Sequence, residues 1–310
     1  MQQHAQEAFP WLTTRFTRRI RIVSPIVVAV DGSVTSYQAV AWAAVEARLR
    51  HCPLHIITSY AIPNGTTGRT AVSGDELAWL RRDGARVLTE AERTAETAAR
   101  GDTLAITTEF TLELITPTLI ARSKRARLLV VGNRGRGAIR RAVLGSVSSA
   151  VTRHAHCPVV VVHEVAETGS MSLAQPVVVG VDGTENSLPA VESAFQEASL
   201  RQVGVIAVHA WSDTTGYDLP AVDWNRIRDT EEALLSESLA GLGEKYPEVP
   251  VQRFVARDTP VRALLEHADR AQLLVVGSHG RGGFAGLLLG STSTALLHLA
   301  DCPVLVVRQD

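Results

Sequence analysis

The sequence Pro25-Ile-Val-Val-Ala-Val-Asp-Gly-Ser33 occurs a second time, with few changes, as Pro176-Val-Val-Val-Gly-Val-Asp-Gly-Thr184. Each copy is a short, continuous and largely β-branched apolar run, which is typical of a parallel strand buried on both faces. Two downstream blocks repeat in the same order: residues 126–132 with 271–277, and residues 156–162 with 301–307. A repeat over this distance indicates a duplicated domain.

The length of 310 residues agrees with two domains of ordinary size. The repeat predicts one domain at 25–163 and a second at 176–310. It leaves an N-terminal arm at 1–24 and a linker at 164–175.

Within each half, apolar runs alternate with helical patterns, which predicts right-handed crossovers and a doubly wound parallel sheet. The fold class is therefore α/β, with two tandem flavodoxin-like or Rossmann-like domains. We expect strands near 25–31, 54–60, 105–112, 127–132 and 157–162, then 176–182, 203–210, 249–256, 272–277 and 302–307. We expect helices near 35–50, 75–100, 117–125 and 145–155, then 186–201, 225–243, 260–269 and 291–300.

The bulk composition excludes several classes of protein. A net charge of −1 gives no overall field toward nucleic acid or anionic lipid. Three cysteines without CxxC spacing argue against a disulfide framework or a zinc site, and are typical of a reducing compartment. The apolar runs are too short for a membrane helix. We therefore expect a cytoplasmic protein with neither nucleic-acid binding nor membrane insertion.

Glycines and a serine follow the fourth strand of each half with the spacing G-x2-G-x9-G-S. Glycine lets backbone N–H groups approach phosphate oxygens, and a helix that begins at the last glycine directs its positive end at the same anion. The serine hydroxyl either caps that helix or donates to a phosphate. The residues are Gly132, Gly135, Gly145 and Ser146 in the first half, and Gly277, Gly280, Gly290 and Ser291 in the second.

An acidic residue ends the first strand of each half, at Asp31 and Asp182. Each either caps the following Asp-Gly turn or binds the base or ribose of a nucleotide beside the cleft. The sequence contains neither the Walker G-x4-GK[ST] loop nor a GxGxxG fingerprint after these strands.

The Asp-Gly-Ser/Thr start, the G-x2-G-x9-G-S loop and the closing Cys-Pro-Val strand together resemble the universal stress protein family, in its ATP-binding, tandem-domain form. The resemblance covers 25–163 and 176–308 and implies a five-stranded flavodoxin-like fold in each half. It also implies that ATP contacts the first-strand Asp, the end of the second strand and the glycine loop. Those positions are Asp31, Ser59, Gly132, Gly135, Gly145 and Ser146, then Asp182, Ala210, Gly277, Gly280, Gly290 and Ser291.

The resemblance further implies a stress-response regulator that forms homodimers, often through the last strands, and binds ATP with Mg²⁺. Two alternatives stay open: a slow ATP-hydrolysing enzyme, or a scaffold that has lost nucleotide binding. No catalytic constellation is evident in the sequence, so binding is better supported than turnover.

Overall fold

The computed structural model describes residues 23–61, 73–101, 103–135, 144–164, 174–211, 224–281 and 289–308. Most of the predicted N-terminal arm and linker lies outside these ranges. The first half contains β1 (Ile26–Ala29), α1 (Val34–Leu49), β2 (Leu54–Ser59), α2 (Gly74–Ala98), β3 (Ile106–Thr111), α3 (Ile115–Ser123), β4 (Leu128–Gly132), α4 (Ser146–His154) and β5 (Val159–Val162). The second contains β6 (Val177–Val181), the 3-10 turn η1 (Glu185–Ser187), α5 (Leu188–Arg201), β7 (Val205–Ala210), α6 (Trp224–Ser238), α7 (Leu242–Lys245), β8 (Val251–Ala256), α8 (Pro260–Ala268), β9 (Leu273–Gly277), α9 (Ser291–Leu299) and β10 (Val304–Val307).

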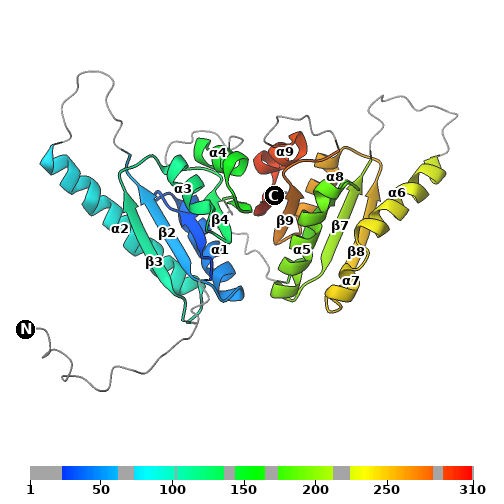
Figure 1. Ribbon diagram of the computed structural model, residues 1–310, viewed down its shortest axis with the longest axis horizontal. Coiled ribbons are helices and arrows are strands. Elements are labelled where there is room, and N and C mark those ends of the chain that lie inside the picture. The colour runs from blue at the N-terminus through cyan, green and yellow to red at the C-terminus, as the bar shows by residue number, and fades with distance from the viewer. Residues whose placement is uncertain are drawn as a thin grey trace, which may run out of the picture.

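The strands form one sheet in the order β3-β2-β1-β4-β5-β10-β9-β6-β7-β8 (Figure 1). All pairs within a half are parallel, so the predicted α/β doubly wound architecture is confirmed. The strand order reverses between β1 and β4 in the first half, and between β6 and β9 in the second. Ligands of such sheets bind beyond the carboxyl ends of the strands at this switch point.

The two halves join through an antiparallel pair between their last strands, β5 and β10, with Val160 opposite Leu305. β5 also pairs with β4, and β10 with β9, so both edges of each last strand are occupied within the chain. The dimerisation through last strands that the resemblance implies therefore occurs here inside one chain. A homodimer of whole chains would require another surface.

Helices cover both faces of the sheet, which explains why the strand sequences are continuously apolar. Successive residues of one strand, such as Val27 and Val28, point to opposite faces and belong to different cores. One core lies under α1, α2, α5 and α6, and the other under α3, α4, α8 and α9. The apolar stripe of α1 is fully buried at Ala39, Val40, Ala43 and Ala47.

The predicted elements agree with the structure to within about two residues at most ends, with one clear exception. The single helix expected at 225–243 is wrong: α6 ends at Ser238 and α7 begins at Leu242. Gly241 between them has φ +78°, a left-handed conformation that interrupts a helix and that glycine adopts without steric cost. Among the described residues, no helix is long and apolar enough to cross a membrane.

A buried cluster of four charged residues links the ends of α1 and α5 across the interface between the halves. Arg50 contacts both Glu46 and Glu197, and Arg201 contacts the same two carboxylates. The side chains of Glu46 and Glu197 are 0% and 1% exposed. Burial would raise the pKa of Glu46, but the two guanidinium groups outweigh it and hold that pKa below the ordinary value. This set is called the interface cluster below.

Candidate functional site at the carboxyl ends of the strands

Asp31 and Asp182 directly follow β1 and β6, where the strand order reverses. One carboxylate oxygen serves the turn in each half: Asp31 Oδ1 accepts from the Ser33 N–H at 3.0 Å, and Asp182 Oδ1 from the Thr184 N–H at 2.8 Å. The turn role considered for these aspartates is therefore present. Gly32 and Gly183 complete these turns with φ +84° and +74°.

The second carboxylate oxygen of each aspartate lies against the glycine loop. A Cβ atom built on Gly135 would lie 2.4 Å from Asp31 Oδ2, and one on Gly280 would lie 3.0 Å from Asp182 Oδ2. The fold thus brings together two residues about 100 positions apart in each half, as the sequence predicts. A side chain at either position would require the carboxylate to shift, more so at Gly135 than at Gly280.

The last glycine of each loop is the N-cap of the following helix, at Gly145 for α4 and Gly290 for α9. The N–H groups of both glycines already donate hydrogen bonds: Gly145 N–H to Asn133 O and Gly290 N–H to Ser278 O, each at 2.7 Å. The helix therefore offers its N–H groups from the next residue onward, because the first intrahelical bond of α4 is donated by Ser149.

Ser146 and Ser291 are the first helical residues and are exposed. They do not occupy the N-cap position, and neither helix has a side-chain cap. The capping alternative for these serines is therefore wrong. Their hydroxyls lie at the end of the helix that faces the carboxyl ends of the strands.

Two serines that the sequence analysis missed, one in each half, attach the helix after the glycine loop to the fourth strand of that half. Ser148 Oγ donates to Gly132 O, and Ser293 Oγ to Gly277 O, both at 2.6 Å. The signal was a second serine two residues after each Gly-Ser pair. These bonds fix the start of the helix relative to the strand end, and thereby the two ends of the glycine loop.

The second-strand positions also lie where the sequence predicts. Ser59 ends β2 and Ala210 ends β7, each one strand away from the aspartate. Both are partly exposed. Ser59 Oγ donates to Glu113 O at 2.5 Å, so its hydroxyl is hydrogen-bonded to the connection between β3 and α3.

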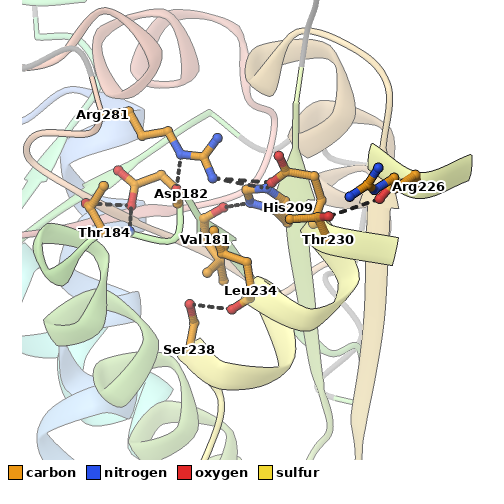
Figure 2. Close-up of polar contacts among 10 residues, drawn as sticks. Val181, Asp182, Thr184, His209, Arg226, Thr230, Leu234, Ser238 and Arg281 are labelled. Carbon is orange, nitrogen blue, oxygen red and sulfur yellow. Dashed lines mark hydrogen bonds and ion pairs between the residues drawn. The ribbon is translucent and has the colours of Figure 1, made fainter. Parts of the chain in front are cut away.

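A polar network that has no parallel in the sequence analysis lines the second site (Figure 2). His209, in β7, is fully buried, and its Nδ1 lies 2.7 Å from Val181 O. Its Nε2 lies 2.6 Å from Glu231 Oε2 of α6. Arg281, which follows Gly280, donates from Nε to Asp182 O and places Nη2 3.4 Å from the same Glu231 oxygen.

The described residues of these sites present hydrogen-bonding groups. No group of three or more His, Cys, Asp or Glu residues within the described ranges is placed to hold a metal ion. Burial raises the pKa of both Cys157 and Cys302 to about 12, so neither thiol is an activated nucleophile at neutral pH.

The fold and the loops define a class: a tandem doubly wound α/β protein with an acid and a glycine loop at each switch point. The model of the universal stress protein family matches residues 23–163 and 174–308. The chain therefore belongs to the universal stress protein family.

Curated relatives and solved structures agree with this assignment. Universal stress proteins Rv2005c and Rv2623 of Mycobacterium tuberculosis are 41% and 40% identical over 285 residues, which cover 92% of this chain and 97% and 96% of the relatives. The crystal structure of a universal stress protein from Archaeoglobus fulgidus aligns with 92% of this chain and 98% of that one. It has a TM-score of 0.67 and 20% identity, and so supports the fold.

Proposed function

We propose that each half binds an adenine nucleotide, ATP, and that the chain acts as a nucleotide-responsive regulator in the cytoplasm. The observation that carries this proposal is the contact between the first-strand aspartate and the loop glycine, Asp31 with Gly135 and Asp182 with Gly280. A carboxylate suits ribose hydroxyls, and a glycine loop before a helix start suits phosphates. The motifs resemble those of the ATP-binding members of the family.

The residues present fit such a ligand. A Cβ at any of the six glycines of the two G-x2-G-x9-G-S motifs would meet another atom within 3.4 Å, so a side chain at these positions would crowd the cradle. Bound ATP would supply the charged phosphates that the loop recognises. Mg²⁺ would be held mainly by those phosphates and water, as is common for this ion, since the described residues supply no metal cluster of their own.

A binding role is favoured over turnover by the way the polar groups are used. One oxygen of each aspartate is committed to its turn, and the His209 and Glu231 side chains are bonded to each other. A slow ATP-hydrolysing enzyme, or a scaffold without nucleotide, would be distinguished from a regulator by what the purified chain contains.

The test is to purify the chain without added nucleotide, denature it and identify what is released. ATP, at one molecule per half, supports the proposal. ADP directs the function toward hydrolysis, to be followed by single-turnover kinetics. No nucleotide, together with a flat titration with Mg-ATP, refutes the proposal. The Gly135→Val/Gly280→Val double variant, checked for native circular dichroism, is the control that should release none.

A further inference from the structure

The guanidinium of Arg281 lies in the second site, with part of its donor set uncommitted among the described residues. Nε donates to Asp182 O, and Nη2 faces Glu231 and His209, each at 3.4 Å. Nη1, with its two N–H groups, has no hydrogen-bond partner within the described ranges. The side chain is 43% exposed, so an entering ligand can reach it.

Glu231 is the acceptor that faces the Arg281 guanidinium in the structure. The carbonyl of Val181 can only accept, so His209 Nδ1 carries a hydrogen and donates it. The 2.6 Å contact between His209 Nε2 and Glu231 Oε2 then requires a proton between these atoms. Glu231 is thus fixed by a fully buried ring, and the same oxygen faces Arg281.

Among the described residues of the first half, no histidine takes the place of His209. Thr58 occupies the β2 position that corresponds to His209 in β7, and its buried Oγ1 has no hydrogen-bond partner. The sequence has an arginine at the matched loop position in both halves, Arg136 and Arg281. The histidine and its carboxylate partner are therefore the part of the network that distinguishes the second half.

We propose that Arg281 is the phosphate-binding residue of the second half, and that Glu231, held by His209, is an internal hydrogen-bond acceptor with which a nucleotide's phosphates compete for the guanidinium. This inference rests on the proposed function, since it specifies how one of the two nucleotide sites binds the phosphates of its ligand. The pre-placed guanidinium favours a phosphorylated nucleotide over a nucleoside. Glu231 limits that preference because its oxygen accepts from the same guanidinium.

The test is calorimetric titration of the full chain with ATP and with adenosine, in a Gly135→Val background that removes the first half's contribution. Arg281→Ala should weaken ATP binding about 10- to 100-fold, the range for a lost charged hydrogen bond, and leave adenosine binding unchanged. Glu231→Gln should tighten ATP binding about threefold or more, because a neutral amide oxygen competes less strongly for the guanidinium than a carboxylate oxygen does. The glutamine amide oxygen can still accept from Arg281 and keep it in place.

Arg136→Ala in the same background is the matched control and should change the affinity for neither ATP nor adenosine. An unchanged ratio of ATP to adenosine affinity in Arg281→Ala, or weaker ATP binding in Glu231→Gln, would overturn this inference alone. A wild-type chain that binds neither ligand would refute the proposed function, which separates the two failures.

Discussion

Removing one charge from the interface cluster should destabilise the whole chain. Arg50→Met keeps a long, flexible side chain but removes the guanidinium that contacts both Glu46 and Glu197. A single arginine then faces two carboxylates that are 0% and 1% exposed. Breaking a buried ion pair by removing one partner costs about 3–5 kcal/mol, and we expect the free energy of unfolding to fall by that amount.

Urea denaturation followed by circular dichroism measures this loss, provided that the m-value stays unchanged. Arg93→Met is the control: Arg93 pairs with Glu90 at 3.4 Å but is 70% exposed, so its loss should cost about 0–1 kcal/mol.

Replacing all four members of the interface cluster by Leu or Met should restore most of the stability, because well-packed apolar residues often substitute for a complete buried ion network. A cost below about 1 kcal/mol for Arg50→Met would refute the reasoning. So would a fourfold variant less stable than the single one.

Three further predictions test the loops, the thiols and the interface. Gly84→Val should lower the unfolding free energy by about 1–3 kcal/mol, because its Cβ would lie 2.4 Å from the Phe110 ring, which packs against the core; Gly135→Val, whose Cβ meets the Asp31 carboxylate outside the hydrophobic core, should abolish ligand binding in the first half at a smaller loss of stability. Cys157 and Cys302 should resist a thiol reagent at pH 7 until denaturant is added, because burial raises their pKa to about 12; rapid labelling of the native chain would contradict this. The pKa of Glu46 is held below its ordinary value of 4.5, so its contribution to stability is present above that pH and is lost as pH falls below it; acid denaturation should be shallower in Glu46→Gln.

The fold could be predicted from the sequence because the information is local and occurs twice. Continuous apolar runs such as Leu128–Val131 are explained by strands covered on both faces, and the repeat fixes which runs correspond. The break at Gly241 was missed because a single glycine inside a helical pattern only weakens the helix, and tertiary packing decides whether it ends there. The pairing of β5 with β10 depends on long-range contacts that no local pattern specifies.

The candidate site was predictable to the extent that topology alone creates it. Asp31 and Gly135 meet because both follow parallel strands that flank the switch point. The contacts of Arg281 with His209 and Glu231 span 72 and 50 residues and involve loop and helix positions without periodic spacing. The interface cluster did leave a signal, since its Glu and Arg recur in register at the ends of two otherwise apolar helix faces.

Joining the two domains in one chain has a consequence that a homodimer cannot have. In a symmetric dimer, every substitution at one site is also present at the other. Here Thr58 and His209 occupy the same place in the two halves, so the sites differ in their polar side chains while the sheet stays continuous. The residues that hold the halves together, Glu46 with Arg50 and their repeats, are instead the same in both. The interface is thus nearly symmetric, whereas the two sites are not. Under this condition two sites in one molecule can acquire different ligand preferences.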